Sequence, residues 1–137
     1  MPARSKARKR ALDVLFEAEL RSAEPLVVLD ELVVRSQHEL NPFTGEVVAG
    51  VMANRARIDE LISTYSLGWT LSRMPGVDRN LLRIGIWELL WGDAPDGVVL
   101  AEVTRMASEL STDESGPFVN GLLARVVEVR EHLVLDK

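Results

Sequence analysis

The spacing of apolar residues is the feature that most constrains how this chain folds. In almost every apolar stretch of the 137-residue sequence, large apolar side chains recur three or four residues apart. This is the period of an amphipathic helix, and no stretch shows the sustained alternation typical of a strand. The sequence therefore predicts an all-α fold. The clearest stripe lies in the segment that starts at Val77 and contains Leu81, Leu82, Ile86, Leu89 and Leu90.

Residues that favour helix starts and turns divide the sequence into segments. The predicted helices cover residues 4–22, a segment starting near Pro25, 42–66, 77–91, 98–110 and 115–133. Asn41 is predicted to cap the helix that opens with Pro42, and Ser115 to cap the last helix. Gly92 suits a helix end, while Pro75-Gly76 and Pro95-Asp96-Gly97 are predicted turns. The pattern in 42–66 fits either one long helix or two.

These elements suggest two three-helix halves that meet near residues 66–76, within a single domain spanning 1–137. No uncharged apolar run approaches the about 18–20 residues that a membrane helix requires. The basic start continues directly into a charged amphipathic stretch, unlike a secretory signal. We therefore expect a cytoplasmic protein.

Charge is distributed unevenly along the chain. Residues 1–10, here called the basic arm, contain Arg4, Lys6, Arg8, Lys9 and Arg10 and no acidic residue. The rest has 11 basic and 21 acidic residues, so the whole chain carries −5. Such asymmetry is typical of proteins that bind polyanions. The alternative is a solvated N-terminus that aids solubility.

Residues suited to catalysis are scarce. The chain has no cysteine and two histidines, His38 and His132, and no glycine-rich phosphate loop. Glu128 and His132 lie one helical turn apart, but one such pair does not supply the ligands that a metal needs. We expect no enzyme, metal or cofactor.

Aromatic residues give a second candidate for nucleic-acid contact. Trp87 and Trp91 lie in the most apolar segment and are expected to pack in the core, whereas Trp69 lies beside a turn. Phe118 directly follows the polar segment 112–117, so it could stack on a base or anchor the last helix.

Three segments together resemble the bacterial NusB family. They are ARKRAL at residues 7–12, VDRNLLRIGIWELL at 77–90 and STDESGPFVNGLL at 111–123. The resemblance covers nearly the whole chain. It implies a fold of two three-helix bundles and a function as an RNA-binding adaptor in transcription antitermination. The implied partners are the boxA element of ribosomal RNA transcripts, the ribosomal protein NusE and the RNA polymerase antitermination complex.

The resemblance also assigns residue roles. It implies RNA contacts by the basic arm and by the Phe-Val-Asn-Gly segment, and partner contacts on two other helices. The expected RNA-binding residues are Arg4, Lys6, Arg8, Arg10, Phe118 and Asn120, and the expected partner-binding residues are Phe16 and Asp78.

Two positions depart from the family pattern. Ser5 occupies a position that is basic in some relatives, and Gly116-Pro117 stands where many have a lysine. Asp78 has a structural alternative, since a carboxylate at the start of a helix can cap it.

Other interpretations of the sequence stay open. A helical protein–protein scaffold without RNA binding is the main alternative, and a homodimer would use the same faces as RNA and NusE. A NusB-like domain also begins certain ribosomal RNA methyltransferases, but those need a Rossmann-type domain and this sequence has no G-x-G-x-x-G signal.

Overall fold

The computed structural model describes residues 2–37 and 39–133. Within those ranges the chain forms α-helices and short 3₁₀ turns, with no strand, which confirms the predicted all-α fold. The helices are α1 (Ala3–Arg21), α2 (Pro25–Arg35), α3 (Pro42–Ala53), α4 (Arg55–Tyr65), α5 (Gly76–Trp91), α6 (Asp96–Leu110) and α7 (Ser115–Val129), with 3₁₀ turns η1 (Leu71–Arg73) and η2 (Arg130–His132).

The segment 42–66 forms two helices, separated at Asn54. Asn41 caps the first as predicted, because its side-chain oxygen accepts a hydrogen bond from the Phe43 N–H at 2.9 Å. At the other end, the Asn54 side-chain amide donates to the Gly50 carbonyl at 2.9 Å. An asparagine side chain that bonds nearby backbone groups competes with regular helix formation. The Asn54 backbone, at φ −117° and ψ 16°, therefore separates α3 from α4.

Two predicted boundaries were wrong. Asp96 and Gly97 belong to the first turn of α6 rather than to a loop, and only Pro95 precedes the helix. Ser115 is the first residue of α7 and not its cap. Its hydroxyl accepts a hydrogen bond from the Thr112 N–H and donates one to the Asp78 carboxylate. Ser115 therefore links α7 to α5 instead of capping the helix.

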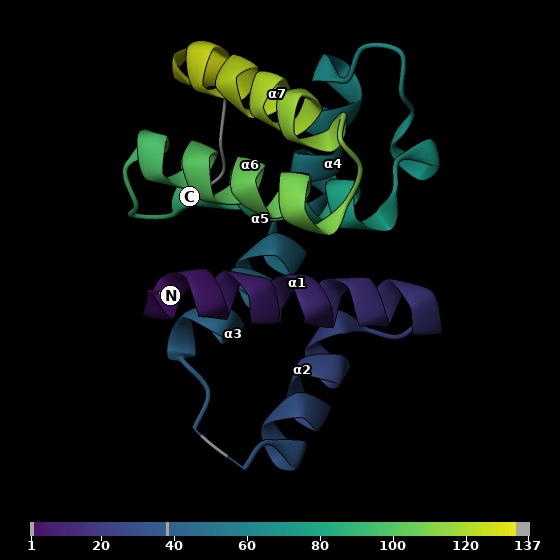
Figure 1. Cartoon of the computed structure of the whole chain (residues 1–137), viewed down its shortest axis with the longest axis vertical. Coiled ribbons are helices and arrows are strands. Elements are labelled where there is room, and N and C mark those ends of the chain that lie inside the picture. Colours follow the sequence, from purple (N-terminus) through teal and green to yellow (C-terminus); the bar gives the residue numbers. More distant parts are fainter. Residues whose placement is uncertain (1, 38, 134–137) are drawn as a thin grey trace.

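Helices α1 and α5 hold the two halves together. Figure 1 shows α2 and α3 on one side of α1 and the helices α4–α7 on the other. Helix α1 packs on α2, α3 and α5, while α5 also packs on α3, α4, α6 and α7. The first bundle is α1–α3 and the second is α5–α7, with α4 packed on α5 and α7. This agrees with the predicted pair of three-helix bundles.

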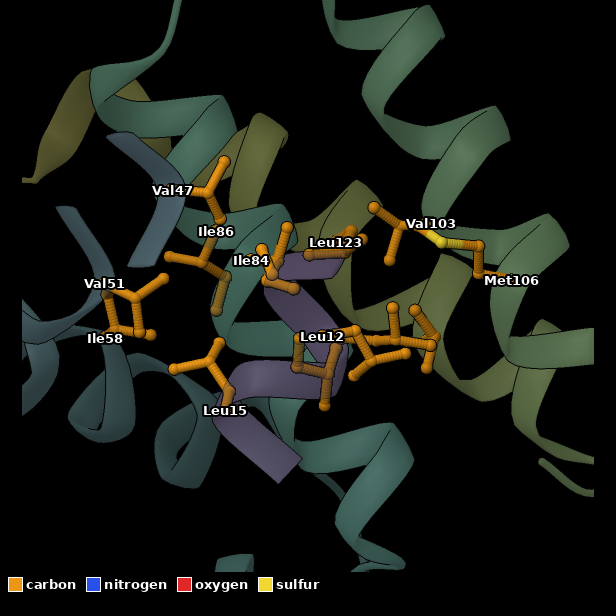
Figure 2. Close-up of a cluster of buried hydrophobic side chains, with 14 of the residues drawn as sticks. Leu12, Leu15, Val47, Val51, Ile58, Ile84, Ile86, Val103, Met106 and Leu123 are labelled. Atoms are coloured by element: carbon orange, nitrogen blue, oxygen red, sulfur yellow. The ribbon is translucent and has the colours of Figure 1, made fainter. Parts of the chain in front are cut away.

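One continuous core fills both bundles. Figure 2 shows side chains from α1, α3, α4, α5, α6 and α7 converging on a common interior, among them Leu12, Leu15, Val47, Val51, Ile58, Ile84, Ile86, Val103, Met106 and Leu123. Most of α5 is buried, including Leu81, Leu82 and Ile84 at 0% exposure. The two bundles therefore share one interior rather than folding around separate ones.

A close approach between α3 and α5 depends on a glycine. A β-carbon built on Gly50 would lie 2.0 Å from Nε1 of Trp87. Phe43 packs against the same indole, with ring centroids 6.4 Å apart. Trp87 and Trp91 both pack against the core, as expected from the sequence.

We expect Gly50→Ala to destabilise the fold by about 1–3 kcal/mol, because the added methyl displaces the Trp87 ring. Gly121→Ala is the matched control, since Gly121 lies in α7 and a β-carbon added there would meet nothing within 4 Å. Alanine is the better helix former, so this control should gain up to about 1 kcal/mol. Urea unfolding of both variants measures the difference, and equal stabilities would contradict the close approach.

Candidate nucleic-acid interface

The basic arm is part of a helix. Residues 3–10 form the first two turns of α1, so their side chains point in fixed directions. Ser5, Ala7 and Arg8 face the interior and are buried. Arg4, Lys6 and Arg10 are exposed. The arm therefore presents only part of its charge to solvent.

Arg8 lies inside the protein in a buried ion pair. Its Nε and Nη2 donate to the two carboxylate oxygens of Glu88 in α5, at 2.7 Å and 2.8 Å. The Glu102 carboxylate of α6 lies 3.6 Å from Nη1. The Arg8 side chain is 2% exposed. A bidentate pair of this kind satisfies the guanidinium without any outside anion. The burial thus favours a structural role for Arg8 over the RNA contact expected from the sequence.

The other arm cations differ in how free they are. Arg4 pairs with Asp93 at 2.8 Å and lies over the Phe43 ring, 4.2 Å from its centroid. Lys9 pairs with Asp13 at 2.7 Å. Within the described part of the chain, Lys6 and Arg10 have no ion pair and both are exposed. They are four residues apart, so they share one side of α1. We call these two residues the cationic ridge.

Phe118 lies beside an open groove between α4 and α7. Its ring is partly buried and meets Trp69 edge to face, with centroids 5.0 Å apart and planes at 68°. The groove has a volume of about 610 Å³, and its lining includes Tyr65, Leu67, Phe118, Leu122 and Arg125. Phe118 thus packs on the protein and still borders solvent.

Two groove residues were not found from the sequence. Arg125 in α7 lies 5.8 Å from the Tyr65 ring centroid and is 56% exposed. Tyr65 is the only tyrosine of the chain and ends α4, but the pairing with Arg125 joins residues 60 positions apart. Only the packing of α4 on α7 brings them together.

The segment from Gly116 to Asn120 packs closely on α6. Asn120 is exposed, and its side-chain oxygen accepts from the Thr104 hydroxyl at 3.3 Å. A β-carbon on Gly116 would lie 2.2 Å from the Ser108 hydroxyl oxygen. The glycine that stands before Pro117 therefore allows α7 to begin close against α6.

The arm and Phe118 are separate sites. In Figure 1, α1 starts on the left of the view and α7 starts on the right. Helix α6 runs between them, since it follows Asp93 in the chain and ends at Leu110, shortly before α7. The structure therefore brings the expected RNA-binding residues to two separate places rather than into one pocket.

The two expected partner-binding residues lie near the start of α5. Phe16 is partly buried, and its ring covers Gly76, where a β-carbon would come within 2.6 Å. Asp78 is fully buried, and one carboxylate oxygen accepts from the Ser115 hydroxyl at 2.8 Å. The Asp78 carboxylate lies beside the first residue of α7, and the positive N-terminal end of that helix stabilises its charge. This position favours a structural role for Asp78 over direct contact with a partner.

Charged residues near Phe16 connect α1 to α5. Arg79 donates to both carboxylate oxygens of Glu19, and Arg83 donates to Glu19 at 3.2 Å and to Asp59 at 2.9 Å. Burial raises the pKa of the Glu19 carboxyl, but the hydrogen bonds and charges of Arg79 and Arg83 outweigh burial and lower that pKa below its ordinary value. The carboxyl half of α1 is thus fixed to α5.

The described residues offer little for metal binding. No three histidine, aspartate or glutamate side chains gather into a metal-binding group in residues 2–37 and 39–133. His38 lies outside the described residues. None of the helices in those ranges is both long and apolar enough to cross a membrane.

The fold and its exposed cations define a helical binding protein with two packed bundles. Residues 5–128 match the family model described as the NusB family. This chain belongs to the NusB family. Similar proteins include the transcription antitermination protein NusB of Acidothermus cellulolyticus, with 57% identity over 92% of this chain and 88% of that protein. The protein of the same name from Kineococcus radiotolerans is 55% identical over 97% and 98% of the two chains. The family consists of transcription antitermination factors and not enzymes.

Solved structures show the same fold. Thermotoga maritima NusB superposes with a TM-score of 0.82 at 32% identity, over 93% of this chain and 92% of the other. A complex described as antitermination factors NusB and NusE with double-stranded RNA matches with a TM-score of 0.82 at 25% identity, over 94% of this chain and 98% of the matched chain.

The burial of Arg8 generates a stability prediction. Arg8→Met leaves the Glu88 carboxylate buried without its partner, and we expect a loss of about 3–5 kcal/mol in the free energy of unfolding. The double variant with Glu88→Leu removes both charges and should recover most of that loss. Arg10→Gln, an exposed arm residue, should change stability by less than about 0.5 kcal/mol. Urea unfolding of the three variants is the measurement, and a stable Arg8→Met protein would contradict the buried pair.

Proposed function

We propose that this protein is an RNA-binding adaptor in transcription antitermination, which binds boxA of ribosomal RNA transcripts together with the ribosomal protein NusE. The observation that carries the proposal is the cationic ridge, Lys6 and Arg10, exposed on one side of an ordered helix. Membership of the NusB family and the match to a complex of NusB, NusE and RNA support it. Transcription takes place in the cytoplasm of bacteria, and we place the protein there.

The ridge suits a phosphate backbone because it is already ordered. Each phosphate that a lysine or arginine neutralises releases condensed counterions, and this drives non-specific binding to nucleic acid. A helical arm orders its side chains before binding, so less conformational entropy is lost on association than for a flexible tail. In this proposal Lys6 and Arg10 make the main phosphate contacts, whereas the guanidinium of Arg4 is engaged by Asp93.

The groove at Phe118 suits an unstacked base. Single-stranded RNA is recognised largely by stacking of splayed bases on aromatic or arginine side chains. Phe118 packs edge to face against Trp69 and also borders the open groove. Asn120, two residues further on, lies on a different side of α7, where its exposed amide accepts from Thr104 of α6. RNA that contacts both the ridge and the groove would follow the surface along α6.

NusE is proposed to bind the face around Phe16. The partly exposed Phe16 ring lies between α1 and the start of α5, next to the Glu19 and Arg79 pair. Asp78 contributes to this face indirectly, because its hydrogen bond with Ser115 connects the start of α5 to the start of α7. The complete assembly would then deliver RNA and NusE to the RNA polymerase antitermination complex.

The scaffold alternative has one observation in its favour. Helix α2 is mostly apolar, but only Pro25 and Val28 are buried. Val34 is 84% exposed and Val27 is 52% exposed. An exposed apolar face of this kind often marks a protein contact. A scaffold would use this face and would bind no RNA through the arm.

The ridge is tested by Lys6→Gln combined with Arg10→Gln. Each phosphate contact on a single strand contributes about 0.7 to the slope of log K against log salt, so losing two should flatten the slope by about 1.4. Titration of labelled boxA RNA at several salt concentrations, with and without NusE, measures this. The control is Arg35→Gln with Arg55→Gln, which removes the same charge from exposed positions outside the arm. If both double variants bind RNA like the wild type, the ridge is not an RNA site.

Phe118→Ala separates stacking from packing. If the ring stacks on a base, affinity for boxA RNA should fall by about 1–3 kcal/mol with an unchanged salt slope. If it only anchors α7 on Trp69, the melting temperature falls and the folded protein binds RNA normally. Leu67→Ala removes an exposed aliphatic side chain from the same groove and should leave both quantities unchanged. Normal RNA affinity in a folded Phe118→Ala protein would contradict the proposed stacking.

A further inference from the structure

Asp93 holds the guanidinium of Arg4. The Arg4 Nη1 donates to one carboxylate oxygen at 2.8 Å, and Nη2 lies 3.5 Å from the other. One face of the guanidinium rests on the Phe43 ring. Arg4 is therefore the arm cation that is exposed and also paired with an acidic residue from another part of the chain, the connection between α5 and α6.

The ends of α5 and α6 position this carboxylate. Asp93 lies in the short connection between Gly92, the C-cap of α5, and Pro95, the N-cap of α6. Both helices pack in the core, so the connection has little freedom to move its acid away from α1. The Asp93 side chain is 78% exposed and the Arg4 side chain 43% exposed. The pair thus lies beside two helix ends and is accessible from solvent.

A carboxylate and a phosphate compete for the same donors. Both accept two parallel N–H bonds from the fork of an arginine. The hydrogen bond and charge of Arg4 hold the pKa of the Asp93 carboxyl below its ordinary value, so this acid stays ionised at neutral pH. An RNA phosphate that binds the same edge of Arg4 must displace Asp93 or meet its charge.

The acidic residues beside Arg4 differ in how they are paired. An open groove beside the arm is lined by Arg4, Arg8, Asp93, Val98 and Glu102. Arg8 is paired inside with Glu88, and Glu102 pairs with both Arg8 and Arg105. Asp93 is therefore the acid of this groove that pairs with Arg4, and a phosphate backbone on this side of α1 meets its charge, whereas Lys6 and Arg10 stay free.

We propose that Asp93 is an internal competitor for RNA phosphate at Arg4, which lowers the affinity of the arm and confines backbone contacts to the cationic ridge. This inference rests on the proposed RNA-binding function. Asp93 would act on the protein without RNA by occupying the guanidinium edge that phosphate otherwise takes. Its removal would add Arg4 to the set of free cations.

The test is Asp93→Asn, titrated with labelled single-stranded boxA RNA over a range of salt concentrations. The amide keeps the shape but loses the charge that competes with phosphate. Since an exposed ion pair is worth little, we expect binding about two- to fivefold tighter than the wild type. One further phosphate contact should steepen the salt slope by about 0.7. In an Arg4→Gln background, Asp93→Asn should then leave the salt slope unchanged.

Glu46→Gln is the matched control. Glu46 is an exposed acid of α3 whose charge acts on Arg4, but it makes no hydrogen bond to Arg4. It loses the same charge without freeing the guanidinium, so its salt slope should stay that of the wild type. If Asp93→Asn matches Glu46→Gln, only net charge matters and the competitor is ruled out. Weaker binding by Asp93→Asn would show instead that Asp93 orients Arg4 for RNA, and would also overturn the proposal.

The same titration distinguishes failure of the inference from failure of the proposed function. If the wild type binds RNA through Lys6 and Arg10 but Asp93→Asn changes nothing, the function stands and the competitor is wrong. If neither the wild type nor Asp93→Asn binds RNA, both are wrong. Melting temperatures of all variants should agree with the wild type within error, because the Asp93 and Arg4 side chains are exposed.

Discussion

The buried pair of Arg8 and Glu88 is the interaction on which the placement of the arm depends. It joins the first turns of α1 to the last turns of α5, with both side chains almost fully buried. Two charges inside a protein are tolerated only when each satisfies the other with good hydrogen-bond geometry. The bidentate contact meets that requirement. Because α5 also packs on four other helices, α1 takes its orientation from the centre of the fold.

Fixing α1 in this way determines which arm charges can act outside the protein. Arg8 turns inward, Lys6 and Arg10 turn outward, and Arg4 lies between them against Asp93 and Phe43. A sequence with five cations in ten residues thus yields two free ones within the described structure. The acidic excess of the remaining chain is not a uniform background, because several of its carboxylates pair with the arm. RNA affinity is therefore set by a few positions and not by the total charge of the arm.

The helices could be predicted from the sequence because their stripes are regular and their ends carry asparagine, proline and glycine. The position of Arg8 was also encoded, but it was missed. Leu12 and Leu15 form the apolar stripe of α1, and counting back four residues from Leu12 and then three more leads to Arg8 and Ser5. Arg8 therefore continues the buried face. Treating 1–10 as one basic segment concealed this period.

Contacts between distant helices could not be predicted in the same way, because periodicity gives the buried face of each helix but not its neighbour. Asp78 was correctly seen to open α5, but its burial depends on Ser115 in α7, 37 residues later.

Helix α1 offers a direct physical link between the two proposed partners. Lys6 and Arg10 lie in its amino half and Phe16 in its carboxyl half, a separation of about 15 Å from Lys6 to Phe16 at 1.5 Å per residue. Each half is fixed to α5 by charge, through Arg8 and Glu88 at one end and through Glu19 with Arg79 and Arg83 at the other. Because both halves of α1 are fixed to α5, the distance between the ridge and Phe16 is set by the helix. RNA on the ridge and a protein at Phe16 would then be presented in a constant relative orientation, which is what an adaptor must provide.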